Sequence, residues 1–374
     1  MLMEYIYKPL KTTLKIIVTF LIILFIFFTA IETSLYWTNY SPSYFSYNSS
    51  QVHKSCDFNV KYNMNNLGFR EKDFDFSKPN KKTKIIMIGD SMIMGHGVKE
   101  SDTIPRILEK KLRANNHDSQ VVNLGLSAAN PSLYSQVFRF IALRLKPDIV
   151  IVNYYSGNDP QEMVPYAKQN QTYKYIRNIF DRIMPRTLSF LNKRVSILMG
   201  KDFFSQKKEL VVKKCLSLKD QALEILKGPN DFIFLNNPEY QIAVQRINSL
   251  FIKMQEECEK RGIKFYVNVI DSFIQTRPKY WKLYAEAKAG KDWFSSHQGP
   301  YKANHKFLDE LHTQKNISLI KPLNELWRYT GESLYYEHDG HLNPRGTKLV
   351  ANTIYKKLDN FTFYPKLQIH SLNN

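Results

Sequence analysis

The sequence predicts an α/β fold in which helices cover both faces of a mostly parallel, five-stranded sheet, giving three layers. Two observations indicate this class. From residue 83 onward, short apolar runs alternate with segments whose apolar residues recur at helical spacing, a pattern typical of parallel sheets. One run, "PDIVIVNYY", is rich in β-branched residues, as in a strand buried on both faces.

The alternation predicts each element in turn. Strands are expected at residues 85–88, "QVVNLG", "PDIVIVNYY", "KFYVNVID" and "ISLI". Helices are expected over 104–112 after a Ser101/Asp102 cap, over 131–145, over 247–258 with Gly262 at its end, around 307–311, and after the cap and first-turn pair Asn343-Pro344. The chain shows no internal repeat.

A separate apolar stretch, residues 14–31, precedes this domain. It is long enough to cross a bilayer as a helix. Lysines before it and Glu32 after it predict that residues 1–13 are cytoplasmic and that the remainder is extracytoplasmic, at the cell membrane. A cleaved signal peptide is the rival interpretation, but no small-x-small cleavage site follows, because Ala30 would pair with Glu32. An uncleaved, single-pass anchor is therefore favoured.

The rest of the chain divides into two parts. Residues 32–82 are polar and aromatic and are expected to form a tether, followed by an ordered entry segment at "NNLGFREKDF". Residues 83–374 form the predicted α/β domain. Within it, residues 160–240 are Lys-rich and irregular, which we interpret as a basic insertion and not as a second sheet domain.

Charge and cysteine content restrict the partners. The 374 residues carry a formal net charge of +19, which favours anionic partners such as lipid head groups or acidic glycans, or simply promotes solubility. No nucleic-acid-binding signature accompanies the charge, so nucleic acid is not an expected partner. Cys258 is expected in the core, and a Cys56–Cys215 disulfide is left open. No metal site and no cofactor are predicted, because the cysteines, histidines and acids lack ligand spacing.

Polar residues gather where the predicted strands end. Strand one ends in Gly89-Asp90-Ser91, strand two in Asn123-Leu124-Gly125 and strand three in Ser156-Gly157-Asn158-Asp159, while Asp339 and His341 precede the last helix. In an open parallel sheet, ligands bind outside the carboxyl ends of the strands. Acyl transfer through serine requires a base beside the hydroxyl, donors for an oxyanion and a group that orients the histidine. All three requirements are represented at this edge.

These blocks resemble those of the SGNH (GDSL-like) hydrolase superfamily. The four blocks are Gly89-Asp90-Ser91, the glycine of "NLG", the Asn-Asp of "SGND" and the histidine of "DGHLN", and they occur in order over residues 83 to about 358. "NNLGFRE" also resembles the entry segment of membrane-anchored members. The resemblance implies a flavodoxin-like SGNH hydrolase fold.

The resemblance also implies a role for each residue. Ser91 would be the nucleophile, and His341 would be the general base and then the acid, oriented by Asp339. The oxyanion hole would consist of the Ser91 N–H, the Gly125 N–H and the Asn158 side-chain amide. Taken singly, each residue has a simpler interpretation as a turn, a cap or a surface residue. Their shared order along one edge favours the joint interpretation.

Two positions depart from the family pattern. Ser156 stands where the third block usually has glycine, and His338 stands where the acid is expected, so that Asp339 is only two residues before His341. This Asp-x-His pair resembles alginate-type O-acetyltransferases of the superfamily, and Glu337 is the alternative acid. We expect His338 to be a bystander and His96, close to Ser91, to be solvated.

The function expected from these features is a membrane-anchored serine esterase that removes acyl groups from an envelope glycan or another ester. Two alternatives remain open. The same triad could transfer an acyl group to a saccharide hydroxyl, as an O-acyltransferase. A non-catalytic protein that binds glycan through its basic insertion is the third option. The sequence indicates neither the acyl group, nor the acceptor, nor the oligomeric state.

Overall fold

The computed structural model describes residues 2–37, 50–76, 82–167, 187, 215–227, 238–277 and 306–359, together with 279, 280, 282 and 286. The chain divides into two units, Met1–Ser43 with Gln169–Lys207, and Tyr44–Lys168 with Lys208–Asn374. The sheet and every predicted site residue belong to the second unit.

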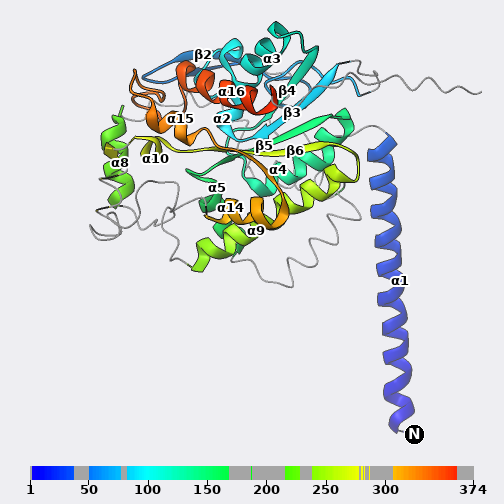
Figure 1. The fold of residues 1–374 in the computed structure, drawn as a ribbon. Coiled ribbons are helices and arrows are strands. Elements are labelled where there is room, and N and C mark those ends of the chain that lie inside the picture. Colours follow the sequence, from blue (N-terminus) through cyan, green and yellow to red (C-terminus); the bar gives the residue numbers. More distant parts are fainter. Residues whose placement is uncertain are drawn as a thin grey trace, which may run out of the picture. The chain divides into compact units, whose positions relative to one another are not determined.

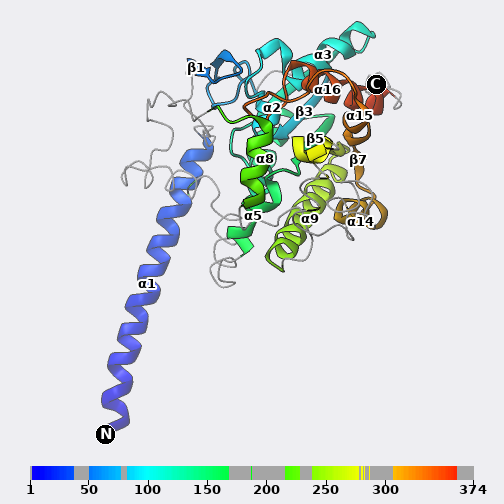
Figure 2. The ribbon, with the colours of Figure 1, turned by 90° about the vertical axis from the view of Figure 1, so that its left-hand side faces the viewer.

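The predicted five-stranded parallel sheet is present. Its strands are β3 (Thr83–Gly89), β4 (Ser119–Gly125), β5 (Ile149–Tyr155), β6 (Lys264–Ile270) and β7 (Ser318–Ile320). They pair in the order β4-β3-β5-β6-β7, all parallel. Figure 1 labels β4, β3, β5 and β6 of this sheet, and Figure 2 labels β7. The first strand of this sheet in the sequence, β3, therefore lies between the next two, β4 and β5. The strand order reverses between β3 and β5. Ligands of open α/β sheets bind at such a reversal, outside the carboxyl ends.

Helices cover both faces of the sheet, and the alternation of side chains along β3 decides which residue faces which layer. Ile85 and Met87 pack with α2 (Ser91–Met94), α3 (Ile104–Ala114), α10 (Phe273–Thr276), α15 (Leu323–Arg328) and α16 (Pro344–Asp359). Ile86 and Ile88 pack with α4 (Pro131–Val137), α5 (Asp159–Ala167), α9 (Pro238–Glu259) and α14 (Lys306–Lys315). Figure 2 shows α3 and α16 on one side of the strands and α9 and α14 on the other. The three-layer prediction is confirmed.

The helix ends follow the predicted caps with one exception. The Asn343 side chain accepts hydrogen bonds from the N–H groups of Arg345 (3.0 Å) and Gly346 (3.1 Å), so it caps α16. Gly262 follows α9 in a left-handed conformation, with φ of +67°. The exception is α3: Glu100–Asp102 form a 3₁₀ turn, and the helix begins after Thr103.

The helix predicted over 131–145 changes its hydrogen bonding partway. It is α-helical over Pro131–Val137, π-helical over Phe138–Ala142 and 3₁₀ over Leu143–Leu145. Phe138, Ile141 and Ala142 of the π-helical part are all buried. Packing of these side chains against the sheet thus accompanies the departure from regular α-helix.

The segment predicted as tether and entry is more structured than expected. Residues 50–63 form an antiparallel hairpin of β1 (Ser50–Lys54) and β2 (Asn59–Asn63). Beyond it, the Phe69 side chain lies in the sheet core. Residues 38–49 of the predicted tether lie outside the described part, as does most of the predicted insertion. Within that insertion, α5, α8 (Leu218–Lys227) and the start of α9 are helical.

The first unit contains α1 (Leu2–Trp37). Its stretch Lys15–Leu35 is long and apolar enough to span a bilayer, judged by length and composition. Large apolar side chains along it, from Ile16 to Phe27, are exposed. The helix continues past residue 31, so residues 32–37 are helical and not part of a tether.

Candidate active site

Ser91 lies where β3 meets α2, at the carboxyl edge of the sheet. The strand ends at Gly89, and the Asp90 side chain caps α2 by accepting a hydrogen bond from the Met92 N–H at 2.9 Å. Glycine is needed at 89, because a Cβ there would lie 2.6 Å from the Ile93 side chain. This sharp strand-to-helix turn leaves Ser91 at the first position of the helix, with 8% of its surface exposed.

Ser91 and His341 meet, although 250 residues separate them. The Ser91 Oγ lies 2.8 Å from the His341 Nε2. On the other side of the ring, the Nδ1–H of His341 donates to the Asp339 Oδ1, which also accepts the His341 backbone N–H at 3.1 Å. With Nδ1 protonated, Nε2 is left as the acceptor for the serine hydroxyl. The geometry is that of a base in contact with a hydroxyl and oriented by an acid.

The hydrogen bonds around Asp339 keep it ionised. Burial by itself raises the pKa of this carboxyl, but hydrogen bonds from His341 and His96 outweigh burial and hold the pKa well below its usual range. An ionised carboxylate only accepts hydrogen bonds. Asp339 therefore fixes the ring nitrogens that face it as donors.

The two neighbours considered at the acid position lie elsewhere. Glu337 is exposed, and Asp339 is the carboxylate that contacts His341. His338 is bound by Asp57, which accepts its backbone N–H at 2.7 Å and its Nδ1–H at 3.0 Å. His338 thus supports the loop and does not contact Ser91 within the described hydrogen bonds.

Gly125 lies beside the Ser91 turn, in register with Gly89. A Cβ at Gly125 would approach the Met94 N at 2.1 Å, so only glycine lets β4 and α2 come this close. Its N–H donates to the Asn123 side chain at 2.9 Å. An oxyanion would therefore share this donor with Asn123.

Asn158 follows β5, the strand next to β3. Its Nδ2 donates to the Glu162 Oε1 at 3.0 Å, and this uses one of the two protons on the amide nitrogen. Next to it, buried Asp159 accepts hydrogen bonds from the Tyr155 N–H and the Tyr134 hydroxyl, both at 2.9 Å, and so holds the turn. Burial, followed by the nearby charge of Asp90, raises the pKa of Glu162 to about 7.

His96 was expected to be solvated, and that expectation is wrong. Its side chain is 13% exposed, and its ring stacks on the His341 ring with centroids 4.1 Å apart and planes 28° apart. Its Nε2 lies 3.2 Å from the Asp339 Oδ2. The only hint in the sequence was its position between two glycines, both of which adopt positive φ.

The entry segment explains why this loop is fixed. The buried Arg70 guanidinium donates to the carbonyls of Gly95 (2.7 Å) and Val98 (2.9 Å), and it lies over the Tyr62 ring. The Tyr62 hydroxyl accepts the Gly97 N–H at 2.6 Å. Arg70 is the arginine of "NNLGFRE". Its hydrogen bonds to the loop at residues 95–98, which follows Ser91, could not be derived from the sequence.

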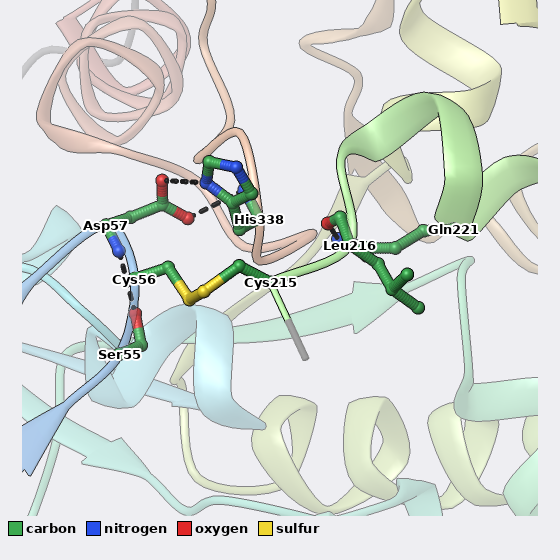
Figure 3. The surroundings of a disulfide bond; sticks show 7 residues. All are labelled: Ser55, Cys56, Asp57, Cys215, Leu216, Gln221 and His338. Carbon is green, nitrogen blue, oxygen red and sulfur yellow. Dashed lines mark hydrogen bonds and ion pairs between the residues drawn. A yellow bond between two sulfur atoms is a disulfide. The ribbon is translucent and has the colours of Figure 1, made fainter. Parts of the chain in front are cut away.

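A disulfide lies beside the loop that carries His338 and His341. Cys56 and Cys215 are bonded with Cα atoms 6.1 Å apart, across 159 positions of sequence. Figure 3 shows the bond next to Asp57 and its contacts with His338. The pairing that the sequence left open is present in the structure. Cys258 is buried on α9, as predicted, and burial raises the pKa of its thiol to about 12.

Among the residues that the structure describes, one group of side chains has donor atoms close enough together for a metal ion. Atoms of His96, Asp339 and His341 lie within 4.8 Å of one another. Hydrogen bonds already account for this arrangement, because each ring directs one nitrogen at a different oxygen of the carboxylate. This grouping was not foreseen from sequence spacing, because His96 is 243 residues from Asp339.

Comparison with known sequences and comparison with solved structures give different results. No family model matches the sequence, and no curated protein matches it at a significant level. Solved structures do match. TesA is 12% identical, with 74% of this chain and 98% of TesA covered and a TM-score of 0.40. A lipase/acylhydrolase from Enterococcus faecalis is 12% identical, covers 74% and 95%, and has a TM-score of 0.41. A lipolytic protein of the G-D-S-L family from Desulfitobacterium hafniense is 13% identical, covers 74% and 99%, and has a TM-score of 0.38.

Proposed function

We propose that this protein is a serine esterase of SGNH type that works through an acyl-Ser91 intermediate. The observation that carries the proposal is the contact between the Ser91 Oγ and the His341 Nε2 at 2.8 Å, with Asp339 on the far side of the ring. A serine hydroxyl is a weak nucleophile unless a base lies within hydrogen-bond reach. That pairing, at the strand reversal where ligands bind, supports acyl chemistry more directly than the low-scoring similarities to known structures do.

In the proposed reaction the Ser91 Oγ attacks the ester carbonyl carbon while its proton passes to the His341 Nε2. The carbonyl oxygen becomes an oxyanion, for which the Ser91 N–H, the Gly125 N–H and the Asn158 Nδ2–H are the candidate donors. The intermediate then collapses, the C–O bond to the alcohol breaks, and His341 returns the proton to the leaving oxygen. Water attacks the acyl-serine in the second half, with His341 again as base.

Asp339 serves two purposes in this scheme. Its hydrogen bond to Nδ1 keeps the acceptor nitrogen of His341 facing Ser91, and its charge stabilises the imidazolium that forms in each half-reaction. The low pKa of the Asp339 carboxyl ensures that this charge is present at neutral pH.

We further propose that α1 anchors the protein in a membrane with the second unit outside the cytoplasm. The apolar stretch Lys15–Leu35 and the disulfide support this placement, since disulfides persist in oxidising compartments. An anchored, basic enzyme suits an ester at an envelope surface, such as an acylated glycan. A single anchoring helix leaves residues 1–13 on the cytoplasmic side.

The test uses the full chain purified in detergent. It should release p-nitrophenol from p-nitrophenyl acetate and should be labelled by a fluorophosphonate probe at Ser91. Ser91→Ala should lose both activities, whereas Ser101→Ala, an exposed serine nearby in sequence, should keep both. Full activity in Ser91→Ala would overturn the proposal.

Transfer to a sugar hydroxyl is the second candidate, favoured by the Asp339-x-His341 arrangement. The same preparation, supplied with an acyl donor and with or without an oligosaccharide, separates the two reactions. Acylated sugar formed at the expense of free acid would indicate a transferase. A folded protein that neither turns over ester nor takes the probe would instead indicate a non-catalytic, glycan-binding protein.

A further inference from the structure

His96 occupies a rigid loop between the serine and histidine parts of the site. Gly95 and Gly97 on either side have φ of +85° and +76°, and this loop is fixed from the hairpin side, where Arg70 donates to the Gly95 carbonyl and the Tyr62 hydroxyl accepts from the Gly97 N–H. From the other side, the Tyr336 hydroxyl donates to the Gly97 carbonyl at 2.7 Å. A Cβ at Gly97 would lie 2.6 Å from the Tyr336 ring. The loop therefore has little freedom to carry the His96 ring elsewhere.

The His96 ring contacts both members of the acid–base pair. Its Nε2 lies 3.2 Å from the Asp339 Oδ2, while the His341 Nδ1–H donates to the other oxygen. Because the carboxylate is ionised and only accepts, the Nε2 of His96 must carry its proton. The two oxygens are thus held by two different rings, and rotation of the carboxylate about its axis would break a hydrogen bond.

The surroundings of His96 favour the neutral ring. The rings of His53 and Phe58 lie nearly perpendicular to it, with centroids 4.8 Å and 5.3 Å away, and His341 covers one face. Burial lowers the pKa of His96 to about 4, even though Asp339 acts in the opposite direction. A neutral ring can stack on His341 without opposing the positive charge that His341 acquires during acyl transfer.

We propose that His96 is a positioning residue, which fixes the Asp339 carboxylate through its Nε2–H and supports the His341 ring by stacking. This role rests on the proposed acyl-serine function and deepens it. It also accounts for the short Asp-x-His spacing. With only Gly340 between the acid and the histidine, the local backbone supplies one N–H to Asp339, from His341, and His96 supplies the additional donor.

The test compares His96→Gln, which keeps an N–H donor, with His96→Phe, which keeps a stacking ring but has no donor. His312→Gln on α14 is the matched control, since His312 lies on the opposite layer. With p-nitrophenyl acetate we expect His96→Phe to lower kcat by about 10-fold to 100-fold, the size of effect found when a hydrogen-bond partner that orients a metal-bound histidine is removed. KM should change by less than about twofold, because in the proposed role His96 acts through Asp339 and His341 and not on the substrate. His96→Gln should recover most of kcat. Equal kcat in wild type and His96→Phe, or equal loss in both variants, would overturn the proposal.

A second measurement does not depend on turnover. In the ¹⁵N-histidine spectrum of the full chain in detergent, His96 should be neutral with Nε2 protonated, and the Nδ1–H signal of His341 should weaken or move in His96→Phe. If wild type fails to hydrolyse ester but this signal responds, the acyl-serine function fails and the positioning contact stands. A His341 signal indifferent to His96→Phe would refute the contact itself. Loss of wild-type activity in EDTA, restored by Zn²⁺, would also overturn it, because the same atoms would then be metal ligands.

Discussion

Asp57 and His338 connect the β1–β2 hairpin to the loop that carries His341. The two carboxylate oxygens of Asp57 accept the backbone N–H and the Nδ1–H of His338, at 2.7 Å and 3.0 Å. The next residue back, Cys56, is disulfide-bonded to Cys215 (Figure 3). The turn of the hairpin is therefore hydrogen-bonded to the loop that carries His341 through Asp57, and is covalently bonded to the segment before α8 through the adjacent Cys56.

Asp57→Ala should reduce activity through this loop. We expect kcat for p-nitrophenyl acetate to fall by about threefold to tenfold, and the free energy of unfolding to fall by roughly 1–3 kcal/mol, as for the loss of charge-assisted hydrogen bonds. Asp73→Ala is the matched control, because Asp73 also accepts a backbone N–H, from Asn66, within the entry segment. Equal kcat in the two variants would show that the His338 contact has no influence on the site.

The disulfide should stabilise the second unit strongly. It closes a loop across 159 positions, for which the chain-entropy relation gives about 5 kcal/mol. The double variant Cys56→Ser/Cys215→Ser should unfold at a lower temperature than wild type, and a reducing agent should lower the wild-type midpoint while leaving the double variant unchanged. Cys258→Ala should remain sensitive to the reducing agent. A wild-type midpoint that ignores the reducing agent would contradict the prediction.

The sheet and its order could be predicted because each strand is a local signal. A β-branched run such as "PDIVIVNYY" is specified by its own residues, and alternation with helices then implies parallel pairing. The hairpin was missed although Phe58, Val60 and Tyr62 alternate with polar residues, because its strands are short and lie among irregular sequence. The alternation has a structural reason only in the folded protein, where Phe58 and Tyr62 are buried and pack against the loop that follows Ser91.

The positions of the motif residues in the site could be predicted from the sequence. The positions of residues that are buried by side chains far away in the sequence could not. The proximity of Ser91 and His341 followed from the resemblance, and the structure brings them to 2.8 Å. His96 could not be placed in this way, because its burial is produced by Phe58 and Asp339, which lie far from it along the chain. The catalytic and oxyanion roles themselves stay predictions.

Asn158→Ala tests the proposed oxyanion donor. Loss of one such donor typically costs about 10²-fold to 10³-fold in kcat, and we expect that loss here with little change in KM. Glu162→Gln keeps a carbonyl acceptor for the Asn158 Nδ2 and should remain within about threefold of wild type, whereas Glu162→Ala releases the amide and should show an intermediate loss. Wild-type kcat in Asn158→Ala would remove Asn158 from the mechanism.

Glu162 should also make stability depend on pH. Burial and Asp90 raise the pKa of its carboxyl to about 7 in the folded protein, above the unfolded value of about 4.3. The folded state therefore binds the proton more tightly, and this contribution to stability is full below the unfolded pKa and is lost as the pH rises towards 7 and beyond. After allowance for solvent screening, wild type should lose about 1–2 kcal/mol relative to Glu162→Gln between pH 5 and pH 7.5 in denaturant titrations. Parallel curves for the two proteins would contradict the prediction.

His96 should produce the opposite pH dependence. Its pKa is about 4 in the folded protein, because burial disfavours the charged ring, and about 6.5 when unfolded. Both states are neutral at higher pH, but as the pH falls below 6.5 the unfolded chain binds a proton that the folded protein excludes, so stability is lost down to about pH 4. Wild type should therefore lose up to about 3 kcal/mol more than His96→Phe between pH 7.5 and pH 4.5, measured as free energies of unfolding in denaturant. Since His341 and Asp339 are present in both proteins, their direct contributions largely cancel in this comparison. Equal losses over that range would mean that His96 is free to take up a proton in the folded protein, and hence that its ring is not enclosed between His341, His53 and Phe58.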